Sequence, residues 1–245
     1  MTVRLDSAFR SAARIKRDGS WSLAALILAC IGVAACGKSP QPDAAPEQGH
    51  DQAVSAPAPI DASNLSALLK RCDVGGLTSA LKDVLGLPSS TDVLTFLADA
   101  WGRGDADPQI VACMKKDLVR VYVANALAQG QSNRMIDVAE LPAVLDALRT
   151  SLNSPNQEVV QVGMMGLGDF LTDDDVRHLG ELAEGENQAS SRVAVSTLAL
   201  SCRPAAGAEL KRLADHGGAR LRDDVGVTRE RVKDARTVKC GSTSG

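Results

Sequence analysis

The chain has 245 residues, a formal net charge of −3 and only 2% aromatic residues. Basic residues form no dense cluster along the sequence, which argues against binding to nucleic acid or to anionic lipid headgroups. Surfaces that stack against sugars or single-stranded nucleic acid need exposed rings. The few rings beyond the first 35 residues are instead expected in the core, where they bury a large area: Phe96, Trp101, Tyr122 and Phe170.

Residues 1–35 have the pattern of a cleavable export signal. A basic segment that ends in Arg14, Lys16 and Arg17 precedes an apolar run over residues 22–35. That run is shorter than the about 20 apolar residues that a membrane-spanning helix needs, so it predicts the hydrophobic region of a signal peptide. Its removal takes away five cations and two carboxylates, which leaves a net charge of −6.

The run ends in Val33-Ala34-Ala35-Cys36, which resembles the lipobox of bacterial lipoproteins. The resemblance implies cleavage before Cys36, transfer of diacylglycerol to its thiol and acylation of its amine, with palmitate as a typical chain. Two or three acyl chains give a stable membrane anchor, whereas one binds only marginally. One alternative is Cys30, which would leave a very short hydrophobic region. The other is an ordinary secretory signal with Cys36 as a plain thiol.

The segment after Cys36 has the composition of a spacer. Residues 37–59 are rich in Pro, Ala, Gln, Asp and Ser, which is typical of a disordered linker. We therefore assign 36–60 to the lipidated cysteine and its linker, and expect the rest of the chain to face the periplasm. Gly37, and not Asp, follows Cys36, so resemblance to enterobacterial sorting rules favours the outer membrane over the inner.

Four cysteines remain after the signal and the lipidation site: Cys72, Cys113, Cys202 and Cys240. An even number outside the cytoplasm predicts two disulfides, with three possible connectivities. We favour Cys72 with Cys113 and Cys202 with Cys240, because each pair then stays within its own half of the chain. A zinc site is less favoured, since the sequence has no CxxC and the histidines lack ligand spacing. We therefore expect no metal and no cofactor.

Residues 61–240 predict an all-α domain of antiparallel helical hairpins. Strand signals are nearly absent, whereas apolar residues recur at helical spacing. In 61–130 we expect a small bundle with helix starts at Asp61 or Ser63, at Ser90 or Thr91, and at Asp107 before Pro108. Gly75-Gly76 is expected to separate the first helix from the second. One long helix is expected from Pro108 until Gly130 ends it.

The segment 136–235 resembles the bacterial HEAT-like repeat, in which paired helices stack. A first unit spans Ser154–Leu182, and a degenerate copy about 32 residues later contains Ser191-Arg192-Val193. Arg192 stands where the family often has an arginine. Val160 stands at that place in the first unit. A further helix pair is expected from 145–152 before these units and 221–232 after them, since repeats need neighbours to bury their faces. The alternative is a generic helical bundle. Residues 241–245 are expected to form a flexible tail.

Possible sites of chemistry have simpler structural explanations. Asp173, Asp174 and Asp175 lack the spacing of a calcium loop and favour a helix start. The glycines at 163, 166 and 168 favour close helix packing over a phosphate-binding loop. His178 is a lone histidine, and His216 is placed at a helix C-terminus. No nucleophile motif is present, so we expect no catalytic residue and no enzyme activity.

These features together predict a membrane-anchored lipoprotein whose periplasm-facing repeat domain is a scaffold for protein–protein interaction. One specific version is an inhibitor or immunity protein, with an envelope protein as the partner. The alternative is an envelope enzyme, or a carrier of a lipid or other small molecule, with a pocket between the helical halves.

Overall fold

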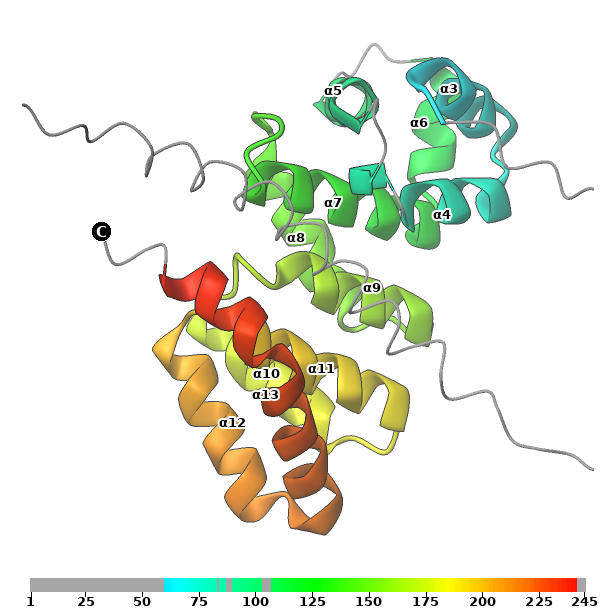
Figure 1. Cartoon of the computed structure of the whole chain (residues 1–245). Coiled ribbons are helices and arrows are strands. Elements are labelled where there is room, and N and C mark those ends of the chain that lie inside the picture. Colours follow the sequence, from blue (N-terminus) through cyan, green and yellow to red (C-terminus); the bar gives the residue numbers. More distant parts are fainter. Residues whose placement is uncertain (1–59, 83, 87–89, 103–106, 242–245) are drawn as a thin grey trace, which may run out of the picture.

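The computed structural model describes residues 60–82, 84–86, 90–102 and 107–241 (Figure 1). In these residues all secondary structure is helical, with eleven α-helices, one short 3-10 helix and no strand. The all-α prediction is therefore confirmed. The predicted signal peptide, Cys36, residues 37–59 of the linker and residues 242–245 lie outside the described residues. Gly241, which we assigned to the tail, is the last residue of a helix.

Five short helical elements form the N-terminal part, at the top of Figure 1. α3 packs against α4 and α6, while α4 and α5 pack against the longer helix α7. The side chain of Asp61 accepts a hydrogen bond from the Asn64 N–H, and Asp107 caps the helix that Pro108 begins, both as predicted. The bounds are α3 (Ala62–Arg71), α4 (Val74–Lys82), η2 (Val84–Gly86), α5 (Ser90–Gly102), α6 (Pro108–Met114) and α7 (Asp117–Ser132).

Two helix boundaries in this part differ from the prediction. Gly75 and Gly76 lie inside α4, and the interruption comes earlier, at Cys72, whose left-handed backbone (φ 50°) ends α3. Asp73 then caps α4 by accepting from the Gly76 N–H. The single long helix expected from Pro108 to Gly130 is instead two helices, α6 and α7, which meet at Lys115–Lys116. No glycine or proline marks that break, which is why the pattern missed it.

The remaining helices form a two-layer stack with α7. One layer contains α7, α9, α11 and α13, each packed on the next, and α10 packs on α12 in the other. α8 packs on α7 and α9. The bounds are α8 (Leu141–Ser151), α9 (Gln157–Leu167), α10 (Asp173–Glu184), α11 (Gln188–Leu200), α12 (Pro204–His216) and α13 (Gly218–Gly241). Antiparallel hairpins stacked in this way are the architecture expected of a helical repeat or bundle.

The pairing of helices within the stack differs from the predicted units. α10 was expected to pair with α9, but its main partners are α11 and α12. The segments 145–152 and 221–232 were expected to form a further helix pair. They lie in α8 and α13, which pack on α7 and α9 and on α11 and α12 respectively. The partner of α8 is therefore α7, which we had grouped with the N-terminal bundle.

Two glycines on α9 allow close approach to the neighbouring helices. A Cβ at Gly163 would collide with Ser151 Oγ, and a Cβ at Gly166 would lie 2.8 Å from a methyl of Leu148. The prediction of close packing is confirmed at these two positions. It is wrong for Gly168, where the nearest atom would be the Met165 carbonyl oxygen of its own helix at 3.4 Å. Helices α7, α9 and α11 are buried around most of their circumference and form the centre of the core.

The aromatic residues lie in or against this core. Tyr122 is buried, while Phe96, Trp101 and Phe170 are partly buried and pack on it. The guanidinium of Arg120 lies over the Trp101 ring, 4.8 Å from its centroid.

Candidate interaction surface

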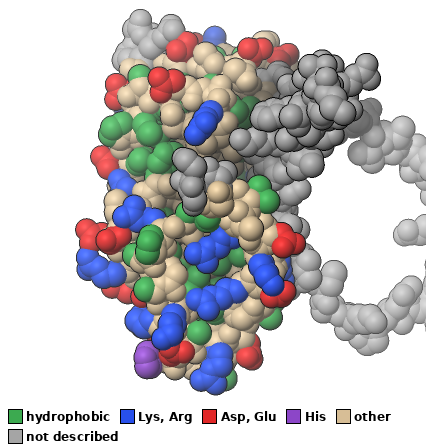
Figure 2. All heavy atoms as spheres, turned by 60° about the vertical axis from the view of Figure 1, so that its left-hand side comes forward, with side chains coloured by type: hydrophobic (Ala, Val, Ile, Leu, Met, Phe, Trp, Pro, Cys, Tyr) green, Lys and Arg blue, Asp and Glu red, His purple; other side chains and the backbone are tan. Residues whose placement is uncertain are grey.

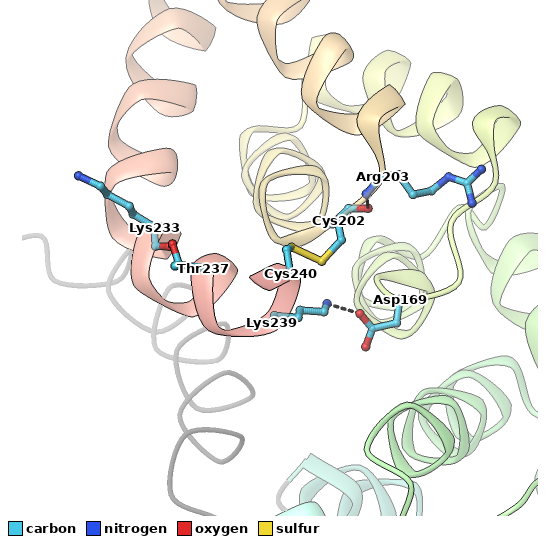
Figure 3. The surroundings of a disulfide bond; sticks show 8 residues. Asp169, Cys202, Arg203, Lys233, Thr237, Lys239 and Cys240 are labelled. Carbon is cyan, nitrogen blue, oxygen red and sulfur yellow. Dashed lines mark hydrogen bonds and ion pairs between the residues drawn. A yellow bond between two sulfur atoms is a disulfide. The ribbon is translucent and has the colours of Figure 1, made fainter. Parts of the chain in front are cut away.

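Both favoured disulfides are present. Cys72 joins Cys113, and Cys202 joins Cys240, with Cα–Cα distances of 5.3 and 5.4 Å. The first bond links the end of α3 to α6. The second links the residues before α12 to the end of α13, as Figure 3 shows. Cys113 is buried, whereas Cys202 is exposed.

The C-terminal end of α13 is also held by ionic contacts. Lys239 forms an ion pair with Asp169, which lies in the turn between α9 and α10 (Figure 3). The hydroxyl of Ser132 on α7 donates a hydrogen bond to the same carboxylate. The end of α13 is therefore fixed at two places, covalently to the start of α12 and ionically to the α9–α10 turn.

The three predicted acidic residues begin α10, as expected. Thr172 is the N-cap: its side chain accepts from the Asp175 N–H, and the Asp175 carboxylate accepts from the Thr172 N–H. Asp175 is buried and receives an ion pair from Arg149 on α8 at 3.1 Å. Burial alone would raise the pKa of the Asp175 carboxyl, but the hydrogen bonds from Arg149 and Thr172 outweigh it and lower this pKa.

The other two acids of the triplet bind different arginines. Asp174 pairs with Arg177 on the same helix, and Asp173 pairs with Arg203 at 3.0 Å. The triplet is thus divided among three cations. Among the described residues, no group of three or more His, Cys, Asp or Glu side chains is placed to hold a metal ion.

The two histidines among the described residues lie on different helices. His178 is half-buried on α10, and His216 is the last residue of α12, at the predicted helix C-terminus. His50 and the predicted lipidation site Cys36 fall outside the described residues.

Sequence reasoning missed a polar contact between the N-terminal part and the stack. The Tyr122 hydroxyl on α7 donates to Glu158 Oε1 on α9 at 2.8 Å. Lys82, the last residue of α4, lies with its Nζ 4.0 Å from the same oxygen and 5.7 Å from the centroid of the Tyr122 ring. Burial first, and the Glu158 carboxylate second, raise the pKa of Tyr122. Three helices thus meet at one phenol.

The second feature that the sequence did not predict is a row of cations on α13. Four basic residues recur at spacings of seven, four and three, which places them on one side of a helix. Arg222, Arg229 and Lys233 are exposed, and Arg236 is half-buried. Figure 2, which brings the left-hand side of Figure 1 forward, shows Lys and Arg side chains spread over the lower part of the molecule. We call these four residues, Arg222, Arg229, Lys233 and Arg236, the cation row.

The cation row corrects the expectation that the chain has no basic cluster. In the sequence each of the first three cations is followed directly by an acid, namely Asp223, Glu230 and Asp234. The linear charge pattern is therefore nearly balanced. In the helix, successive residues are about 100° apart, so the acids form a separate row on a different side of α13.

Comparison with known proteins identifies no relative: no protein-family model, no curated protein and no solved structure matches the chain. Within the described part of the chain, none of the helices combines the length and apolar character that crossing a bilayer requires.

Proposed function

We propose that the chain is a membrane-anchored lipoprotein whose helical domain binds a protein partner at the cell envelope. The observation that carries the proposal is the two-layer helical stack with a fixed last helix. Stacked helices present extended surfaces that suit protein recognition, and α13 is held by a disulfide and an ion pair. The lipobox-like sequence at Cys36 supports the location.

The two disulfides support a location outside the cytoplasm. Cystines persist in oxidising compartments, whereas cytosolic thiols are kept reduced. The outer membrane, facing the periplasm, is the location we propose. An inhibitor or immunity protein is one version of this function.

The anchor is tested by substitution and fractionation. Cys36→Ala should release the protein from the membrane into the soluble periplasmic fraction. Cys30→Ala is the matched control and should leave the protein in the membrane. If the Cys30→Ala variant is released and the Cys36→Ala variant stays in the membrane, the lipidated residue is Cys30. If both variants stay in the membrane, lipid anchoring at either position is refuted.

The partner is tested by crosslinking in intact cells, followed by purification of the full chain and identification of crosslinked proteins. A stoichiometric envelope protein would support the scaffold. Co-purification of a lipid or glycan without any stoichiometric protein would contradict it.

A further inference from the structure

The cation row lies along the seam between α12 and α13. At one end, Arg222 Nε donates to the Ala214 carbonyl oxygen on α12 at 3.4 Å. At the other end, a Cβ built on Gly207 of α12 would lie 3.9 Å from a guanidinium nitrogen of Arg236. Both ends of the row therefore border α12, and the row follows the seam for about 21 Å, given the rise of 1.5 Å per residue.

None of the four cations has a carboxylate partner among the described residues, and Arg222 donates only to a carbonyl oxygen. Most other cations in this half of the chain are paired. Arg192 binds Asp224, Arg203 binds Asp173, and Arg212 binds both Glu184 and Glu209. On the α12 side of the seam, Lys211 is engaged by Asp215 at 3.7 Å. Arg220, outside the row, also contacts only carbonyl oxygens, those of Ala183 and Gly185. The row therefore gathers cations without a carboxylate partner along one line of the surface.

Small residues leave this line open. A Cβ added at Gly226, between the first two cations of the row, would meet no atom within 4 Å. On the α12 side, the row borders Gly207 and Ala214. The side chains of the row are consequently available to a ligand that lies along the seam.

We infer that the cation row binds an acidic, extended segment of the partner protein; this rests on the proposed function and specifies its partner. Alternate residues of an extended chain point to the same side and are about 6.7 Å apart. Arg229 and Lys233, four residues apart on a helix, are separated by about 6 Å along its axis. A segment with carboxylates at alternate positions therefore matches the spacing of Arg229 and Lys233.

The placement of the acids favours a narrow segment over a flat anionic membrane. Asp223, Glu230 and Asp234 are exposed and lie about 100° around α13 from the cations that precede them. A bilayer surface approaching α13 would meet these carboxylates together with the cations and be repelled by them. A single chain lying in the seam contacts the cations without covering the acid row.

The test measures binding of the peptide Asp-Ser-Asp-Ser-Asp-Ser-Asp, labelled with a fluorophore, to the purified full chain by fluorescence anisotropy. The variant Arg229→Gln/Lys233→Gln/Arg236→Gln should weaken binding about tenfold at low salt, because each exposed ion pair contributes about a factor of two to three. The matched control, Arg71→Gln/Lys115→Gln/Lys116→Gln, removes three exposed cations of the N-terminal part and should change binding less than about twofold.

If the two triple variants weaken peptide binding equally, the inference is overturned, because the peptide would then respond to the net charge of the protein and not to the cation row. Absence of peptide binding by the wild-type chain would overturn it as well. A competition experiment tests whether the row binds lipid headgroups instead. Short-chain phosphatidylglycerol is added below its micelle concentration to the complex with labelled peptide. If it displaces the labelled peptide at lower concentrations than the unlabelled peptide does, the row binds headgroups and the inference of a protein segment is overturned. If one of these results is obtained but a crosslinked protein partner is recovered from cells, the proposed scaffold function stands. Only the assignment of the binding site to the cation row is then rejected.

Discussion

The Tyr122 hydroxyl donates to Glu158 Oε1 across 2.8 Å and so connects α7 to α9. Tyr122 is the only tyrosine of the chain, so tyrosinate absorbance reports on this one group. Because burial and the Glu158 carboxylate raise the pKa of Tyr122 above its ordinary value of 10.0, no ionisation is expected near pH 10. A normal titration around pH 10 in the folded protein would contradict this.

The same contact predicts a pH-dependent stability. The raised pKa means that the contribution of Tyr122 is fully present below pH 10 and is lost as the pH rises above it. Tyr122→Phe should cost about 1–2 kcal/mol at neutral pH, since a hydrogen bond to a charged acceptor is removed. Urea unfolding at neutral and alkaline pH measures the difference in free energy of unfolding between wild type and Tyr122→Phe. This difference should shrink as the pH becomes alkaline. Glu158→Gln, which removes the charge, should lower the Tyr122 pKa relative to wild type.

Asp175 predicts the opposite dependence, in acid. Its pKa is lowered below 3.8 by hydrogen bonds that outweigh the effect of burial, so its contribution is present above that pH and is lost as the pH falls through the lowered pKa. Asp175→Asn should destabilise by about 2–3 kcal/mol, less than for a fully buried pair, because Arg149 is one-third exposed. Asp146→Asn, which removes the exposed partner of the same Arg149, should cost less than about 0.5 kcal/mol. Equal costs would show that burial of Asp175 has no energetic role.

The two disulfides should differ in accessibility. Their loops span 41 and 38 residues, so each should stabilise by about 4 kcal/mol through loop closure in the unfolded chain. Because Cys202 is exposed and Cys113 is buried, graded reductant followed by alkylation and mass spectrometry should modify Cys202 and Cys240 first. Prior modification of Cys72 and Cys113 would contradict the structure.

Glycine substitutions test the close approach of α8 and α9. Gly166→Ala places a methyl 2.8 Å from Leu148 and 3.2 Å from the Asn125 Cα, and should destabilise by about 1–3 kcal/mol through overpacking. Gly226→Ala is the control in an exposed helix position with open space around it, and should stabilise by about 1 kcal/mol. Thermal unfolding measures both, and stabilisation by Gly166→Ala would refute the close packing.

The helical class could be predicted because it depends on local signals. Asp61 and Asp107 are capping residues whose effect acts within three residues, and both caps are present. The cysteine pairing followed from keeping each bond within one half of the chain. The break between α6 and α7 has no such signal. Lys115 and Lys116 are good helix formers, and the break instead allows α6 to pack on α3 while α7 packs on α4 and α9.

The candidate surface could not be predicted, because it depends on tertiary placement. Acids at adjacent positions hide the cation row in the linear sequence. The helical repeat separates the cations from the acids, and the packing of α13 on α12 places the cations along the seam. Arg149 and Asp175 are 26 residues apart, and Tyr122 and Glu158 are 36 apart. No helical spacing relates such residues; the stacking of the helices decides which of them meet.

The bond between Cys202 and Cys240 encloses α12 and the greater part of α13. It can close only after both helices have been synthesised and brought side by side, and only where thiols are oxidised. In a reducing compartment the last helix would be held by noncovalent contacts alone. If the protein is exported as we propose, an oxidation step completes the fixing of α13, and the cation row then reaches its final position only in the oxidising compartment.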